Sequence, residues 1–144
     1  MGNSVLRVNW DDTEDVGIIT HYKGEPFTGI CYEVHDNGNL KEEIEMVNGL
    51  KHGDGKLFYE NGQLNIDRNF KDDQQHGKFI KYYEDGKLQV ESEWDNGEQR
   101  GIQKSYSEDG SMNTLDYEEE YRKEHRIRDF KDSNIKENSV KSEF

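Results

Sequence analysis

The chain has 144 residues, of which 35% are charged and only 30% belong to the hydrophobic set. This length allows one domain, and this composition is too polar to build a large two-layer core. The 19 basic and 32 acidic residues leave a net charge of -13, which disfavours binding to nucleic acid or to an anionic membrane surface. Full disorder is also disfavoured, because eight Tyr, six Phe and two Trp recur at regular positions.

Compartment signals consist of absences. The N-terminus from Met1 to Arg7 contains no apolar stretch of the kind that a secretory signal needs, and no run approaches the length of a membrane span. N-myristoylation would need Ser or Thr at the position of Leu6. Cys31 is the only cysteine, so an internal disulfide is impossible, and a reducing cytoplasm is the expected location.

A repeat with a period of 24 residues organises the chain from residue 25 to residue 117. Two glycine series keep this period without a slip, and an apolar or aromatic column follows it. The turn glycines are Gly38, Gly62, Gly86 and Gly110, the second series is Gly29, Gly53, Gly77 and Gly101, and the column is Val34, Phe58, Tyr82 and Tyr106.

Residues 1–24 are interpreted as a degenerate first copy of this repeat. A shift of one period places Trp10 in the aromatic column, and Asp11–Glu14 in the turn, although Glu14 stands where a glycine is expected. The alternation of Val16, Ile18 and Thr20 then predicts a strand.

Each repeat is predicted to form a β-hairpin, because Asn-Gly or Asp-Gly stands between alternating apolar residues. A type I turn followed by a glycine bulge would pair Phe58 with Leu64, whereas a two-residue type I′ turn would pair Tyr59 with Leu64. The first register is favoured, since the column of Phe58 stays apolar or aromatic while the column of Tyr59 ends in Ser107. Short polar links between the hairpins predict one long antiparallel meander.

The tail has two interpretations. A helix over 117–129 would place opposite charges at i,i+4 spacing, and a further degenerate hairpin would place Phe130 in the aromatic column and Asn134 in the glycine column. The expected organisation is one domain over 1–144, with a degenerate unit at 1–24, regular repeats at 25–117, and a C-terminal cap and frayed tail at 118–144. The helical charge pairs are Glu118–Arg122, Glu119–Lys123 and Glu124–Arg128.

The segments Gly77–Leu88 and Lys56–Leu64 resemble the MORN-variant repeat of bacterial proteins, in which a glycine, two aromatics, Asn or Asp, glycine and leucine follow at fixed spacing. The resemblance implies an all-β fold: hairpin repeats in a curled, largely single-layer antiparallel sheet. Many bacterial proteins with these repeats are classed as YwqK-type antitoxins, which are immunity proteins paired with toxins, and others are interaction scaffolds. Met112 departs from the leucine of the pattern, and Ser105 and Ser107 weaken the last copy.

The sequence offers no pattern for catalysis, for a cofactor or for a metal ion. His52 and His76 stand one period apart and are interpreted as polar loop residues that recur with the repeat. Cys31 and His35 would share a strand face but lie about 13 Å apart by strand rise, too far for the histidine to activate the thiol. We therefore expect a protein that is not an enzyme, with no catalytic, cofactor-binding or metal-binding residues.

A protein-binding surface remains, because aromatic anchors inside a charged rim are typical of interfaces. Tyr59 and Tyr83 are either anchors or structural residues of the sheet, and Trp94 is interpreted as a residue of the structural stripe surrounded by an acidic cluster. The candidate partner-binding residues are Tyr59, Tyr83, Glu91, Glu93, Trp94, Asp95 and Glu98.

The leading functional hypothesis is a non-catalytic immunity protein, or antitoxin, that neutralises a cognate basic toxin domain in the cytoplasm. An acidic inhibitor would gain both association rate and specificity against such a partner. A generic protein-interaction scaffold is the alternative. The chain itself is expected to be a monomer or a dimer paired through sheet edges.

Overall fold

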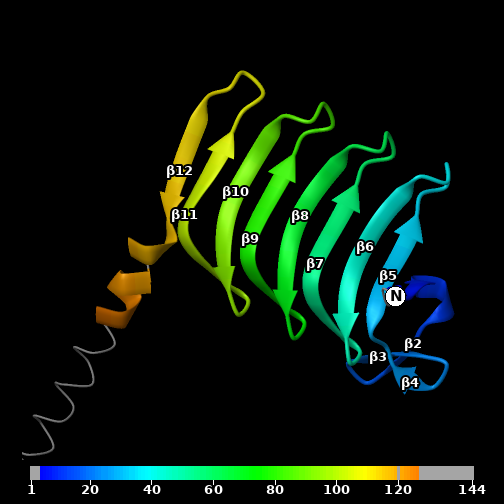
Figure 1. Cartoon of the computed structure of the whole chain (residues 1–144). Helices are drawn as coiled ribbons and strands as arrows, with labels where there is room; N and C mark the ends of the chain where they lie inside the picture. Colours follow the sequence, from blue (N-terminus) through cyan, green and yellow to red (C-terminus); the bar gives the residue numbers. More distant parts are fainter. Residues whose placement is uncertain (1–3, 120, 127–144) are drawn as a thin grey trace, which may run out of the picture.

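The computed structural model describes residues 4–119 and 121–126. In this part of the chain, one 9-stranded sheet and one 3-stranded sheet precede a short C-terminal helical segment (Figure 1). The elements in chain order are β1 (Arg7–Asn9), the 3-10 helix η1 (Trp10–Asp12), β2 (Glu14–Val16), β3 (Ile19–Tyr22), β4 (Glu25–Pro26), β5 (Gly29–Val34), β6 (Leu40–Val47), β7 (Leu50–Phe58), β8 (Leu64–Lys71), β9 (Gln74–Tyr82), β10 (Leu88–Asp95), β11 (Glu98–Tyr106), β12 (Met112–Asp116) and the helical residues 117–119 and 121–126.

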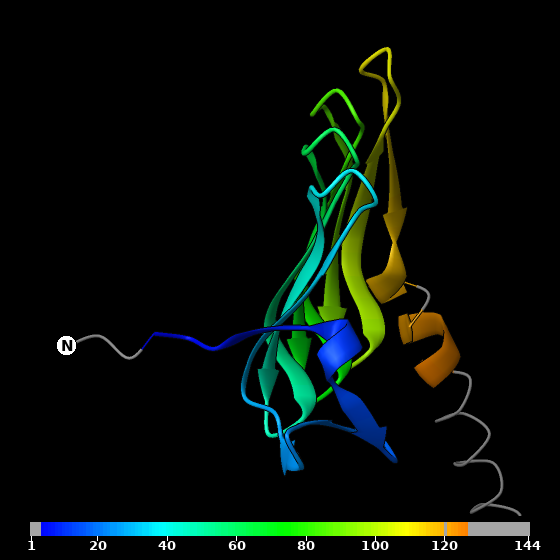
Figure 2. The same cartoon turned by 90° about the vertical axis from the view of Figure 1, so that its right-hand side faces the viewer.

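The large sheet is the predicted meander. From β5 to β12 every strand pairs antiparallel with the next strand in the sequence, and β1 joins β5 in parallel at the end of the sheet. The strands are bent along their length and form a single curled layer, which Figure 2 shows from its side. The expected all-β fold of hairpin repeats is therefore confirmed.

The glycine turns adopt the favoured register. Phe58 pairs with Leu64, and Gly62 follows the turn with φ 87. The N–H of Gly62 donates to the carbonyl of Tyr59 at 2.9 Å, and the N–H of Tyr59 donates to the carbonyl of Gln63 at 2.8 Å. These are the bonds of a type I turn with a glycine bulge, and they recur in the turns that contain Gly38, Gly86 and Gly110.

A second row of turns lies at the opposite end of the strands (Figure 1). These links, here named the tight turns, each contain two residues, both with positive φ, as type I′ hairpin turns require. In three of these turns, the backbone N–H of the first turn residue donates to the side chain of the residue twenty positions before it. Thr28 accepts from Asn48 at 2.9 Å, His52 from Asp72 at 3.4 Å and His76 from Asn96 at 3.2 Å.

The second glycine series explains how these acceptors reach the turns. Gly53 and Gly77 have φ of 103 and 89 and lie beside shifts in strand register, where the chain bulges. Each bulge places the preceding histidine, His52 or His76, next to the tight turn that ends its own hairpin. The two histidines therefore recur because the turn needs an acceptor.

The N-terminal residues do not form the hairpin expected of a first repeat. β1 lies parallel to β5, with Val8 opposite Cys31, and the chain then leaves the large sheet through η1. Without a glycine at Glu14 the bulged turn is not favoured, and the side chain of Asn9 instead accepts the N–H of Asp11 and begins η1. The strand expected through Val16, Ile18 and Thr20 is interrupted, because the chain reverses between β2 and β3.

β2, β3 and β4 form the small sheet, which packs over one end of the large one. One buried cluster joins the two, with Trp10 and Tyr22 packed against it. The last member of the cluster in the sequence lies in β8. None of the described hydrophobic residues after β8 is buried. The members of the cluster are Val8, Phe27, Cys31, Ile44, Met46 and Phe70.

Cys31 is a core residue with 0% of its surface exposed. Burial, with smaller contributions from the carboxylates of Asp15 and Glu42, raises the pKa of its thiol to about 11. A buried thiol that stays protonated is a poor nucleophile.

Candidate protein-interaction surface

Tyr59 and Tyr83 tie successive hairpins together near the glycine turns. The hydroxyl of Tyr59 donates to the carbonyl of Tyr82 at 2.7 Å, and that of Tyr83 donates to the carbonyl of Tyr106 at 2.8 Å. His35 stands at the same repeat position, and its Nε2 bonds to the carbonyl of Phe58 at 2.8 Å. Both tyrosines are half-buried. Their hydroxyls are thus engaged within the sheet, which leaves only ring surface for a partner.

A second set of bonds fixes the turns themselves. Asn37 Nδ2 donates to the carbonyl of Glu60 at 2.9 Å, and Asn61 Nδ2 donates to the carbonyl of Glu84 at 3.1 Å. Asp85, one period later, has no amide with which to extend this series. The first three turns are therefore held in line by side-chain amides, and their carboxylates project from an ordered backbone.

The four glycine turns carry a row of exposed carboxylates, here named the acidic turn row. Lys87 is the only lysine or arginine in these turns, and it lies 3.8 Å from Asp85. Successive turns are two strands apart, which is about 10 Å. The acidic turn row consists of Asp36, Glu60, Glu84, Asp85, Glu108 and Asp109.

Two details show how the acidic turn row is held. The side-chain and backbone hydrogen bonds from Ser111 keep the pKa of Asp109 below its ordinary value. Burial, and then the nearby charge of Glu84, raises the pKa of Tyr59. An open cavity of about 450 Å³ lies beside the row. Its lining includes Leu57, Tyr59, Glu60 and Glu84, and also Lys41, which pairs with Glu33 at 3.3 Å. The row thus combines negative charge with aromatic and aliphatic surface.

The other candidate residues do not form one cluster. Side chains alternate along β10, so Glu91, Glu93 and Asp95 lie on one face and Trp94 lies on the other. Trp94 Nε1 donates to Ser92 Oγ at 3.1 Å on that opposite face. The expectation that the acidic residues surround the tryptophan is therefore wrong.

The acidic residues of β10 are also balanced by lysines from neighbouring strands. Glu93 stands opposite Lys78 of β9, and Glu91 stands opposite Lys104 of β11. These side chains, together with Ile80 and others, line a cavity of about 210 Å³.

Asp95 and Glu98, at the tight turn, lie apart from that cavity. Asp95 Oδ1 is 3.5 Å from His76 Nδ1, and Glu98 is exposed. The most strongly acidic surface therefore lies at the glycine turns and not on β10. The Asp and Glu residues that recur before each turn glycine could have indicated this.

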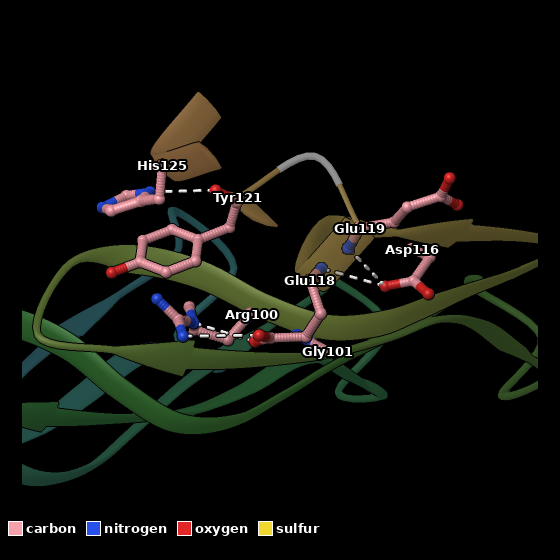
Figure 3. Close-up of polar contacts among 7 residues, drawn as sticks. All are labelled: Arg100, Gly101, Asp116, Glu118, Glu119, Tyr121 and His125. Carbon is pink, nitrogen blue, oxygen red and sulfur yellow. Dashed lines mark hydrogen bonds and ion pairs between the residues drawn. The ribbon is translucent and has the colours of Figure 1, made fainter. Parts of the chain in front are cut away.

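The C-terminal helical segment packs against the start of β11, where it contacts Arg100 and Gly101 (Figure 3). Arg100 occupies the repeat position of Thr28, His52 and His76, but the described residues that follow β12 form a helix and no tight turn. Its Nε donates to Glu118 Oε1 at 2.9 Å, and the N–H of Gly101 donates to the same oxygen at 3.2 Å. The guanidinium also lies 4.0 Å from the ring centroid of Tyr121. The repeat position that accepts turn amides elsewhere here anchors the helix.

The described part of the tail adopts the helical one of the two predicted alternatives, and the helix begins at residue 117 as that alternative expects. Asp116 Oδ1 accepts the N–H groups of Glu118 and Glu119, and the expected pair of Glu119 with Lys123 forms at 2.9 Å. Arg100 pairs with Glu118 at 2.9 Å, and the charge of Arg122, the expected helical partner, also lowers the pKa of Glu118. The remaining features of the tail, Arg128, Phe130 and Asn134, lie outside the described residues.

We expect acid to release this helix from β11. The Gly101 N–H and Arg100 lower the pKa of Glu118, so the stabilisation is present above the ordinary carboxyl pKa and is lost as the pH falls through the lowered one. Hydrogen exchange at the Gly101 amide, corrected for intrinsic rate, should show this loss of protection. Arg100→Ala should remove the protection at neutral pH, and Arg126→Ala should preserve it. A protection factor insensitive to both acid and Arg100→Ala would contradict the anchoring role.

Comparison with known families matches three of the hairpins. A profile described as the MORN repeat variant matches residues 27–48, 51–72 and 75–96. The matches begin one predicted period apart, and each covers one hairpin built on a glycine turn. The hairpin of β11 and β12, which contains Met112, lies outside them. Neither the search of curated proteins nor the search of solved structures found a match.

The three matched hairpins carry the MORN repeat variant, and this repeat favours a protein-interaction module. Among the described residues, no group of three or more His, Cys, Asp or Glu is arranged to hold a metal ion. The described helical residues include no helix long and apolar enough to cross a membrane.

Proposed function

We propose that this protein is a non-catalytic immunity protein, an antitoxin that binds a basic toxin domain through its acidic turn row. The observation that carries the proposal is the row itself: six exposed carboxylates, of which the four on the first three turns stand on a backbone that side-chain amides hold in place. Charges fixed in advance cost less entropy on binding than charges on mobile loops.

The electrostatics of the row favour a basic partner. A line of like charges steers an oppositely charged protein and repels acidic competitors. The rings of Tyr59 and Phe58 line the cavity beside Glu60 and offer the apolar contact that an interface core needs. A toxin domain that acts on nucleic acid would be basic, because it must itself bind phosphates.

A generic interaction scaffold is the second candidate, and a different observation favours it. On the face that carries Glu91 and Glu93, the lysines 78 and 104 balance the charge around the 210 Å³ cavity. A partner that binds there would not need to be basic. The two candidates therefore differ in the surface used and in the response to salt.

The proposal predicts that a neighbouring gene encodes the cognate toxin domain, and the test measures association of this protein with that domain. The double variant Glu60→Lys with Glu84→Lys should lower the association rate constant at least tenfold, because both changes lie in the acidic turn row. The matched control, Glu14→Lys with Glu25→Lys, makes the same charge change at exposed positions of the small sheet and should lower it far less.

Added salt should also slow association of the unmodified protein, since it screens exposed charges. Full protection of cells by the turn-row variant, or an association rate that is independent of salt, would overturn the immunity proposal. A binding defect produced only by reversing Glu91 and Glu93 would support the scaffold.

A further inference from the structure

The two ends of the large sheet differ. At one end β1 has only three residues, runs into η1, and contributes Val8 to the buried cluster. At the other end β12 has five residues, all exposed, and the strand order of the described residues stops there (Figure 1). The helix that follows β12 packs over β11 through Arg100 (Figure 3). Among the described residues, no strand pairs with the outer edge of β12.

The hydrogen-bond pattern shows which backbone groups of β12 face outward. The N–H of Ser107 donates to the carbonyl of Ser111, so this pair is hydrogen-bonded across the hairpin. Bonded and non-bonded pairs alternate in an antiparallel ladder. In the register Tyr106–Met112 to Ile102–Asp116, the backbone groups of Met112, Thr114 and Asp116 consequently point away from β11.

This edge lacks the features that usually prevent strand pairing. β12 contains no Pro and no Lys, and its register with β11 has no bulge. Asp116, at its end, is its only charge. Apolar side chains lie along the same margin: Ile102 is 54% exposed, Met112 52% and Leu115 46%. The edge thus offers both unpaired backbone groups and apolar area.

We propose that β12 pairs antiparallel with β12 of a second copy, about a two-fold axis through Thr114. The outward-facing residues are symmetric about Thr114, so the strand is complementary to itself in this register. Thr114 then stands opposite Thr114, Met112 opposite Asp116, and Asn113 opposite Leu115. No two like charges face each other, which is what a self-pairing strand requires.

The net charge of -13 on each copy opposes this association. Salt screens that repulsion, so the dimer should be favoured by salt, whereas binding to a basic partner should be weakened by it. The proposal therefore does not depend on the immunity function, and opposite responses to salt separate the two.

Sedimentation of the full chain over a range of concentrations, at low and high salt, tests for the dimer. The unmodified protein should show a reversible monomer–dimer equilibrium that shifts toward dimer as salt is added. A full chain that stays monomeric under all these conditions would overturn the proposal.

A charge-swap experiment tests the register. Thr114→Asp alone and Thr114→Lys alone each place like charges opposite each other and should weaken the dimer about two- to fivefold. An equal mixture of the two variants should recover it, because opposite charges then face each other. Thr114→Ala is the matched control and should dimerise nearly as well as the unmodified chain.

Thr114→Pro tests the backbone contribution. It removes an outward N–H that β11 does not use, a position at which an edge strand tolerates proline. Dimerisation should be lost while the melting temperature stays close to that of Thr114→Ala. Unchanged dimerisation of Thr114→Pro, or no recovery in the Asp and Lys mixture, would show that the copies associate elsewhere.

Discussion

Gly49→Ala should destabilise the protein far more than Gly97→Ala, although the two glycines occupy the same position in equivalent tight turns. Their φ values are 81 and 85, so both substitutions carry a similar backbone cost of about 1–2 kcal/mol. They differ in what surrounds them. A Cβ on Gly49 would lie 2.7 Å from the carbonyl oxygen of Thr20, whereas the nearest atoms to a Cβ on Gly97 are 3.9 Å away in Gln74.

Gly49 is also bonded to the N-terminal segment by both of its backbone groups. Its N–H donates to the carbonyl of Phe27 at 2.8 Å, and its carbonyl accepts the N–H of Thr20 at 3.0 Å. A methyl group there must push the small sheet away from the large one, which adds about 1–3 kcal/mol as overpacking does elsewhere.

Chemical denaturation measures the difference, and the Cys31 thiol locates it. Cys31 is fully buried in the cluster to which Phe27 of the N-terminal segment belongs, so displacement of that segment should make it reactive in Gly49→Ala and leave it protected in Gly97→Ala. Equal stability of the two variants would mean that the N-terminal segment contributes little to the fold.

The hairpins could be predicted from the sequence because the signal is local. A glycine with positive φ after Asn or Asp selects one turn, and that turn sets the register of Phe58 with Leu64. The roles of His52 and His76 could not be predicted in this way. Their partners lie twenty residues away, and the contact depends on a bulge that glycine spacing alone does not describe.

The N-terminal segment was mispredicted because alternation extends through a turn. Val16, Ile18 and Thr20 resemble one strand, but the chain reverses at Gly17 and Ile18, which leaves Ile18 78% exposed. The prediction of a strongly acidic surface on β10 is wrong for a related reason. Its neighbours in space, Lys78 and Lys104, belong to other strands, so charge along the sequence overstates charge on the surface.

Ile44→Ala should cost about 2–5 kcal/mol, the range found for truncating a fully buried aliphatic side chain. Ile44 is 1% exposed and lies opposite Cys31 in the register of β5 and β6. The matched control, Ile102→Ala, removes the same atoms from a side chain that is 54% exposed, and should change stability by about 0.5 kcal/mol or less.

The loss of stability differs between Ile44→Ala and Ile102→Ala because the buried core lies at only one end of the sheet. All the buried hydrophobic residues of the described chain lie between Val8 and Phe70, so β9 to β12 are held mainly by contacts between neighbouring hairpins. In such an array each repeat depends on the one before it. Hydrogen exchange should therefore be fastest in β11 and β12 of the unmodified protein, and Ile44→Ala should raise exchange throughout the sheet. If Ile44→Ala instead leaves exchange in β9 to β12 unchanged, the last hairpins are stable by themselves and the core near Cys31 supports only its own end of the sheet.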